Sequence, residues 1–206
     1  LLTVVVGSGI MGESLAQGNT AVALLANSLA TGAGLFVLIQ NLGPISGAHF
    51  NPVVSLVETF WGRLERRALG FYCFAQVLGA VAGVMVAHAM FGQTIFQVSE
   101  KVRLSLNLGF SEFVATFGLI CTIALAGRKH VEFAPVAVAS YITSAYWFTS
   151  STSFANPAVT IARAVTNTFC GIEPHGVPVF IGAQVFGGLT AYGLLRRLGS
   201  GRQATK

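Results

Sequence analysis

The chain has 206 residues and a formal net charge of +5; 53% of its residues are hydrophobic and only 9% are charged. Soluble domains carry about a quarter charged residues, so this composition excludes an ordinary soluble protein and predicts an all-α protein embedded in a lipid bilayer. The sequence has no paired carboxylates, no nucleophile beside a base and no metal-ligand spacing among its three cysteines. We therefore expect no catalytic residues, no bound metal and no cofactor.

Long uncharged stretches give the predicted elements, because a helix needs about 20 apolar residues to cross a bilayer core. Uncharged stretches cover residues 14–57, 68–99, 133–162 and 174–195, and a fifth, 107–127, contains a single acid. In chain order, the predicted spanning helices lie near residues 1–12, 20–41, 68–91, 107–127, 133–150 and 175–196. The first is too short to span, so the first helix is expected to be incomplete in this chain.

The basic residues are distributed unequally between the gaps that separate these helices. Nine lie in alternate gaps or in the C-terminal tail: Arg63, Arg66, Arg67, Arg128, Lys129, Arg196, Arg197, Arg202 and Lys206. Lys101 and Arg103 lie in an opposite gap. An excess of basic residues marks the cytoplasmic side of a membrane protein, so the C-terminus is predicted to be cytoplasmic. The positive charge therefore indicates topology, and no nucleic-acid partner is expected.

Two of the uncharged stretches, 14–57 and 133–162, exceed the roughly 17–25 residues that one span uses. Both close on a similar phrase, HFNPVVSL in the first and FANPAVTI in the second. The two asparagines, Asn51 and Asn156, are 105 residues apart, about half the chain. This pattern indicates an internal duplication.

The duplication predicts two repeats, residues 1–103 and 104–206, within one pore-forming domain. Each repeat has three spans and one short helix, near residues 51–60 in the first and 156–165 in the second. Because three spans reverse the direction of the chain, the second repeat is inverted relative to the first. The short helices then enter the membrane from opposite faces as re-entrant half-helices, and their loops must line a protein cavity.

Each short helix is expected to begin at its Asn-Pro pair. Asparagine is a favoured N-cap residue, and proline is favoured at the first helical position. Two opposed half-helices would present their partial positive ends and their asparagine amide donors to one point near the midplane. A neutral solute can accept those hydrogen bonds, whereas a cation is repelled.

The chain resembles the aquaporin, or major intrinsic protein, superfamily along essentially its whole length. The resemblance is carried by SGAHFNPVVSL (46–56), SEFVATFGL (111–119) and TSFANPAVTIAR (152–163). The two pore motifs are Asn51, Pro52 and Val53 in the first repeat, and Asn156, Pro157 and Ala158 in the second. Val53 stands where the family usually has alanine, which adds volume near the asparagines.

The family's narrow filter has four positions, and counting from the motifs assigns them to Thr31, Ser144, Ser153 and Val159. A one-residue slip in the count would give Ala30 in place of Thr31, or Thr143 in place of Ser144. Water-selective members have an aromatic residue, a histidine and an arginine at three of these positions. A ring without them is expected to be wide, because the loss of arginine removes five donors and a permanent charge. The alternative is that a neighbouring aromatic side chain fills the space: Phe36, Tyr146, Trp147 or Phe148.

This filter and the segment AVTNTFCGIEPHGVPVFIGAQ (164–184) are most similar to aquaglyceroporins associated with bacterial arsenic-resistance genes. The resemblance implies a passive channel in the bacterial inner membrane for glycerol-like polyols, neutral metalloid acids such as arsenous acid, bulkier methylated arsenicals, and water. It also implies a homotetramer with one pore in each subunit. A water-selective aquaporin with a repacked filter, or a secondary transporter built on broken helices, is the alternative.

Four accessory residues complete the candidate site. The resemblance implies that Glu112 is a buried carboxylate that accepts hydrogen bonds from a half-helix loop, and its counterpart in the first helix would precede residue 1. Arg163, one helical turn beyond the filter, either forms an outer cation barrier or pairs with Glu173 or nearby carbonyls. His49 either lines a vestibule or only packs, and Cys170 either contacts a thiophilic solute or has no role.

Overall fold

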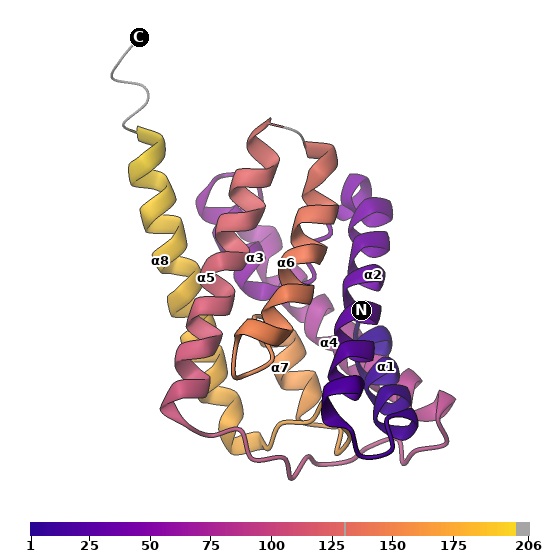
Figure 1. Ribbon diagram of the computed structural model, residues 1–206. Coiled ribbons are helices and arrows are strands. Elements are labelled where there is room, and N and C mark those ends of the chain that lie inside the picture. Colours follow the sequence, from indigo (N-terminus) through magenta and orange to yellow (C-terminus); the bar gives the residue numbers. More distant parts are fainter. Residues whose placement is uncertain (130, 201–206) are drawn as a thin grey trace.

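The computed structural model describes residues 1–129 and 131–200, and this part of the chain is all-helical (Figure 1). The α-helices are α1 (Leu2–Leu15), α2 (Thr20–Ser46), α3 (Pro52–Phe60), α4 (Arg66–Met90), α5 (Leu106–Lys129), α6 (Ala134–Phe148), α7 (Pro157–Arg163) and α8 (Val177–Ser200). Two short 3-10 helices, Val131–Phe133 and Pro174–Gly176, precede α6 and α8. Arg202 and Lys206, which contributed to the predicted orientation, lie outside the described residues.

Four segments of the described chain are long and apolar enough to cross a membrane: Thr20–Ser46, Arg66–Met90, Leu106–Ala126 and Pro174–Gly199. Helices α1 and α6 are apolar but shorter, with 14 and 15 residues. Each of the six lies where the sequence predicted a spanning helix. The two short helices, α3 with 9 residues and α7 with 7, begin one residue after the asparagines of the two repeated motifs.

The longest helix, α2, shows how local sequence sets an element's limits. Its N-cap is Asn19, whose side-chain oxygen accepts hydrogen bonds from the backbone N–H groups of Ala21 and Val22. It ends at Gly47, which adopts the left-handed conformation (φ 73°) that glycine enters without steric cost. Gly47 therefore starts the loop that carries the first Asn-Pro motif.

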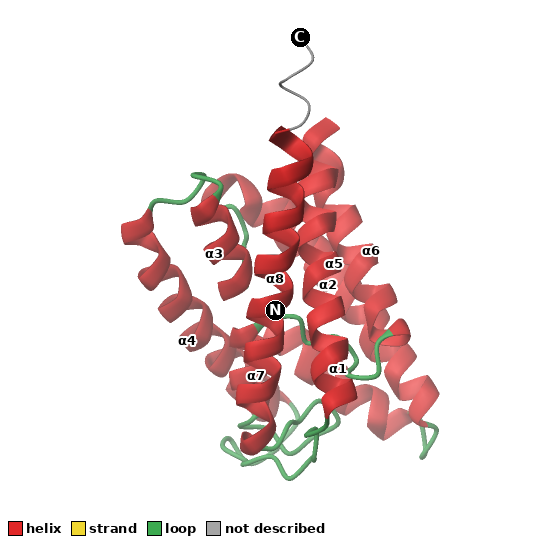
Figure 2. Ribbon diagram, turned by 90° about the vertical axis from the view of Figure 1, so that its left-hand side faces the viewer, coloured by secondary structure: helices red, strands yellow, loops and turns green. Residues whose placement is uncertain are grey.

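The helices form a bundle with two distinct ends, which Figures 1 and 2 show from perpendicular directions. We call one the basic end, because it holds the α3–α4 link with Arg63 and the C-terminal turn of α8. We call the other the loop end, because the connections of residues 91–105 and 164–176 lie there. The α5–α6 connection lies at the basic end.

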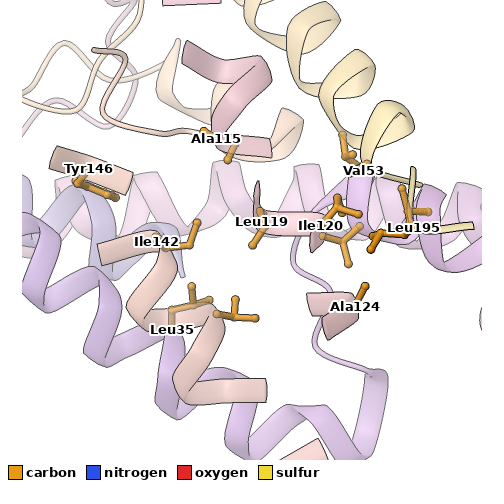
Figure 3. Close-up of a cluster of buried hydrophobic side chains, with 14 residues drawn as sticks. Leu35, Val53, Ala115, Leu119, Ile120, Ala124, Ile142, Tyr146 and Leu195 are labelled. Atoms are coloured by element: carbon orange, nitrogen blue, oxygen red, sulfur yellow. The ribbon is translucent and has the colours of Figure 1, made fainter. Parts of the chain in front are cut away.

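Two hydrophobic clusters surround the short helices. The first joins α2, α3, α5, α6 and α8, and Figure 3 shows it with Leu35, Leu119 and Ile142 gathered on one side and Val53 on the other. The second joins α1, α4 and α7. The half-helices are therefore enclosed by the bundle, where their ends must find partners in the protein.

Val53 belongs to this packing and not to the space beside the asparagines. Its side chain is 1% exposed and contacts α8 at Gly188, where the close approach leaves no room for a Cβ atom. The expectation that Val53 adds volume near the asparagines is corrected: its extra methyl groups fill the interface between α3 and α8.

Candidate functional site

The two asparagines of the motifs cap the two short helices. The side-chain oxygen of Asn51 accepts a hydrogen bond from the N–H of Val53 at 2.9 Å. That of Asn156 accepts from Ala158 at 3.0 Å and from Val159 at 3.3 Å. A proline occupies the first helical turn of each, so both short helices begin as the Asn-Pro pairs predict.

The same two asparagines also bind each other's loops. The Asn51 amide donates to the carbonyl of Ala155, and the Asn156 amide donates to the carbonyl of Phe50, both at 2.7 Å. Each asparagine thus bonds to the residue that precedes the other one. The crossed pair holds the N-termini of α3 and α7 face to face, and each amide retains a second N–H donor.

The two loops share a backbone conformation that L-residues rarely adopt. In the first loop Ala48 and Phe50 have φ values of 46° and 49°, and in the second Ser153 and Ala155 both have 49°. These residues lie three and one positions before each asparagine. Left-handed non-glycine residues cost about 1 kcal/mol or more each and persist only where the surroundings hold them. The duplication therefore extends from the motif letters to the strained backbone before them.

A cavity of about 380 Å³ runs past this meeting point. At one limit it is lined by Glu58 and Arg63 at the basic end, and at the other by Arg163 at the end of α7. Both asparagines and both strained loops line it between these limits. The opposite wall is apolar, with side chains from α2, α5 and α6: Leu35, Ile39, Leu119, Ile123, Val138 and Ile142.

Three of the four predicted filter residues line this cavity together. Thr31, Ser153 and Val159 are 3%, 3% and 7% exposed and come from α2, the second loop and α7. The fourth residue of this ring is Tyr146 of α6, whose hydroxyl donates to Thr31 Oγ1 at 3.3 Å. The hydroxyl oxygen of Ser153 is buried and has no hydrogen-bond partner among the described residues.

Ser144 does not belong to the ring, and this prediction is wrong. Its side chain is exposed, and its hydroxyl donates to the carbonyl of Tyr141 in its own helix at 2.8 Å. A helix turns 100° per residue, so two positions separate an outward Ser144 from an inward Tyr146. Ile142 lies one turn before Tyr146 and Val138 two turns before it, and both line the cavity with Tyr146. Counting from the motif missed this face, but the i, i+4, i+8 apolar pattern of α6 contains it.

The aromatic alternative is therefore correct for one of its four candidates. Phe36, Trp147 and Phe148 are 40%, 48% and 55% exposed and do not line the cavity, whereas Tyr146 is 4% exposed and does. The ring has no histidine and no arginine at its narrow positions, but the expectation of a ring without aromatic residues is wrong.

Glu112 of α5 supports the second loop from behind. Its two carboxylate oxygens accept hydrogen bonds from the backbone N–H groups of Phe154 and Ala155, at 2.9 and 2.8 Å. The Gln184 amide of α8 donates to Glu112 at 2.6 Å and to Thr160 at 2.9 Å. Glu112 is fully buried, and these charge-assisted bonds satisfy it there. The contact that the resemblance implies for Glu112 is present, and sequence reasoning missed its partner Gln184.

The loop-end limit of the cavity carries two arginines. Arg163 is 2% exposed, donates through Nε to the carbonyl of Cys170, and lies 3.4 Å above the ring of Phe154. Arg103 lies 5.3 Å from the same ring and donates to the carbonyls of Gly171 and Ser151. Burial, and then the charge of Arg163, lower the pKa of Arg103 to about 10. Arg163 therefore has the carbonyl partner that was one of its predicted roles, and no ion pair with Glu173 is seen among the described residues. Its role as an outer cation barrier stays a prediction.

The basic-end limit carries an ion pair. Arg63 donates to Glu58 at 3.2 Å, and its guanidinium lies 4.9 Å from the ring of Trp61. His49 also lines the cavity here, with its Nδ1 3.0 Å from the hydroxyl of Ser55. His49 therefore both packs and lines the vestibule. Glu58, which directly follows the uncharged stretch 14–57, was not among the predicted site residues.

Cys170 has no access to the cavity. Its side chain is fully buried, and its thiol contacts the carbonyl of Val5 at 3.4 Å. The Cys170 backbone, by contrast, holds Arg163. Among the described residues no group of three histidine, cysteine, aspartate or glutamate side chains is placed to hold a metal ion.

These features define a helical membrane protein with an internal, pore-like cavity. The family model for "Major intrinsic protein" matches residues 1–149. The chain is 52% identical to Aquaglyceroporin AqpS of Rhizobium meliloti (strain 1021) over 198 residues, which cover 96% of this chain and 84% of that protein. It is 33% identical to Aquaporin NIP1-3 of Oryza sativa subsp. japonica over 176 residues, 80% of this chain and 60% of that protein. It is 36% identical to Aquaporin-2 of Rattus norvegicus over 115 residues, 56% of this chain and 40% of that protein.

The chain therefore belongs to the major intrinsic protein family, which is a family of membrane channels and not of enzymes.

Proposed function

We propose that this protein is a passive channel for small uncharged solutes, chiefly glycerol-like polyols and neutral metalloid acids such as arsenous acid, together with water. One observation carries the proposal: a cavity of about 380 Å³ passes between the two asparagine-capped helix starts, and its ring has Val159 where water-selective relatives have arginine. That volume corresponds to roughly a dozen water molecules. The name of the rhizobial relative, an aquaglyceroporin, supports the same substrate class.

The architecture that fits this function has six transmembrane helices and two re-entrant half-helices. Helices α1, α2, α4, α5, α6 and α8 cross the bilayer, and α3 and α7 enter it from opposite faces. Their crossed asparagine bonds support this arrangement, because they hold two helix N-termini together inside the bundle. Helices α1–α4 (residues 1–103) and α5–α8 (residues 104–206) form the two inverted repeats of one pore domain.

Two further features follow from the charge distribution and from the family resemblance. The positive-inside rule puts the basic end, with the α3–α4 link and the end of α8, in the cytoplasm of a bacterial cell and the loop end outside the inner membrane. Assembly as a homotetramer with one pore in each subunit rests on the family resemblance. Both are expectations that topology mapping and the mass of the detergent-solubilised protein would test.

The two walls of the cavity differ in polarity, and this difference suits a polyol. One wall carries hydroxyl-bearing residues and the asparagine amides, while the facing wall of leucine, isoleucine and valine is apolar. A polyol places its hydroxyls on the first wall and its C–H groups on the second. A hydrated cation cannot replace its water shell there and meets two positive helix ends.

Tyr146 limits the width of the ring. Its phenol occupies one side of the ring and is fixed by the bond to Thr31. Neutral solutes of the size of glycerol or arsenous acid are therefore the ones that we expect to pass the ring. Methylated arsenicals, which are bulkier, are the largest solutes that we expect to pass the ring.

One observation favours a second candidate, a water-selective aquaporin, because Tyr146 is an aromatic residue in the ring. A secondary transporter has less support. Glu112 has both oxygens engaged by backbone and amide donors, and Glu58 is paired with Arg63, so neither carboxylate is free to couple transport to protons.

Stopped-flow swelling of proteoliposomes tests the proposal. We expect glycerol and arsenous acid to enter faster than in protein-free liposomes, with the weak temperature dependence of an open pore and no effect of a protonophore. Water flux with no glycerol or arsenous acid flux would establish the water-selective alternative. Solute flux that a protonophore abolishes would establish a transporter.

A further inference from the structure

Arg163 places a positive charge in the cavity wall one turn beyond the ring. It is the last residue of α7, four positions after Val159, so both lie on one face of the helix about 6 Å apart. Only its Nε is bonded to an acceptor among the described residues, the carbonyl of Cys170. Its two Nη groups have no hydrogen-bond acceptor among the described residues, and they are not buried out of reach. They are therefore accessible from the cavity that Arg163 lines.

No carboxylate neutralises this charge. The ion pairs seen among the described residues join Arg63 to Glu58 and Lys101 to Glu13, and neither includes Arg163. The buried acid Glu112 already accepts three hydrogen bonds from other donors. The second cation, Arg103, faces the same aromatic ring. Among the charged residues that line the cavity, Arg163 at the loop end therefore has no ion-pair partner, whereas Glu58 and Arg63 at the basic end are paired.

Burying an arginine without a carboxylate partner costs free energy. A charged residue that is nevertheless present at membrane depth commonly has a functional role. The carbonyl of Cys170 and the face of Phe154 hold the guanidinium against the wall. In this position it does not occupy the ring formed by Thr31, Tyr146, Ser153 and Val159. Charge and width are thus controlled at two different levels of the same pore.

We propose that Arg163 is the residue that excludes cations at the loop-end mouth, and that its place one turn beyond the ring allows the ring itself to accept larger neutral solutes. The proposal rests on the channel function given above. A unit charge in a low-dielectric wall raises the energy of a passing cation strongly and that of a neutral solute little. The specificity of the pore therefore depends on the ring for size, and for charge on Arg163 at the loop-end mouth in addition to the two helix ends at the asparagines.

The test compares four proteins in liposomes: wild type, Arg163→Gln, Arg163→Lys and the control Arg66→Gln. Arg66 is exposed at the start of α4 and lies outside the cavity wall, so its variant removes an arginine elsewhere. We expect Arg163→Gln to raise the ratio of K⁺ influx to glycerol influx, and of methylammonium influx to glycerol influx, at least about tenfold. Arg163→Lys and Arg66→Gln should exclude both cations as wild type does.

A further variant keeps the proposal testable if Arg163→Gln does not assemble. Val159→Glu places a carboxylate one turn before Arg163, the spacing at which a glutamate pairs with an arginine, and should also admit both cations. The proposal is overturned if an assembled Arg163→Gln channel passes glycerol and excludes cations as well as wild type, or if Val159→Glu does so. Failure of the channel function itself is seen separately, as absence of glycerol influx through the wild type.

Discussion

The two Asn-Pro half-helices begin alike and are supported differently. Around α7, the carboxylate of Glu112 binds two backbone N–H groups of the loop, and Gln184 ties that carboxylate to the half-helix. Around α3, the supports within this chain are neutral: His49 and Gln76 both bond to the hydroxyl of Ser55. The carboxylate that the family resemblance implies for this half-helix would precede residue 1, so the comparison concerns only the groups of residues 1–129 and 131–200, where the same strained backbone is held by a buried charge at α7 and by neutral side chains at α3.

The two mouths of the cavity also differ in how their charged residues are paired. At the basic end Glu58 and Arg63 neutralise each other, and the side chain of Arg63 is 59% exposed. At the loop end Arg163 is buried and has no carboxylate partner among the described residues. The comparison teaches that the duplicated scaffold fixes the asparagines, while selectivity comes from what each repeat adds around them.

Among the variants that test this comparison, we expect Glu112→Gln to have the largest effect on stability. Glu112→Gln leaves one acceptor oxygen for three donors and turns an amide N–H toward another donor, because the site is fully buried. We expect the free energy of unfolding to fall by about 2–4 kcal/mol and the fraction of folded channel in the membrane to fall with it. Thermal unfolding of the detergent-solubilised protein measures the change.

The matched control is Gln76→Ala, which removes a neutral bond to Ser55 from the support of α3. Its cost should be about 1 kcal/mol. If the two variants lose equal stability, the loop of α7 does not depend on the buried carboxylate, and the contrast between the two supports is wrong.

The smallest expected effect concerns the basic-end mouth. The double variant Glu58→Gln, Arg63→Gln removes both charges of the pair together, so it leaves no charge unpaired. Partly exposed ion pairs contribute about 0–1 kcal/mol, and we expect unchanged stability, glycerol influx within twofold of wild type and no cation leak. A cation leak as large as the one expected for Arg163→Gln would show that the basic-end mouth also excludes cations.

Much of the fold follows from local sequence. The uncharged stretches and the Asn-Pro pairs locate all eight helices, because bilayer length and N-capping act within a few residues of each element. The repeated motif also predicts the opposed helix starts. Short-range rules do not contain the crossed bonds from Asn51 and Asn156, since these join loops more than a hundred residues apart.

The ring shows where such reasoning fails. Ser153 and Val159 lie next to the motif and are correctly brought to the cavity, and Thr31 is brought there as well. Ser144 fails because a count across the α6–α7 loop carries an error of two residues, which moves a side chain from the inner to the outer face of a helix. From the sequence, Tyr146 was only one of four aromatic residues that could fill the ring. The exposed fractions of their side chains distinguish the four, and these follow from the packing of the helices.

The central claim is that Val159 leaves open a ring that passes solutes larger than water. Proteoliposome swelling with Val159→Arg tests it most directly, with Val159→Leu and Ser144→Leu as uncharged controls at an inner and an outer position. Cavity water and nearby carbonyls can solvate the added guanidinium, so the variant should assemble. We predict that glycerol and arsenous acid influx fall at least about tenfold, that water influx falls less, and that Ser144→Leu conducts as wild type. An assembled Val159→Arg channel with unchanged glycerol influx would contradict the account, because Val159 would then not line the constriction.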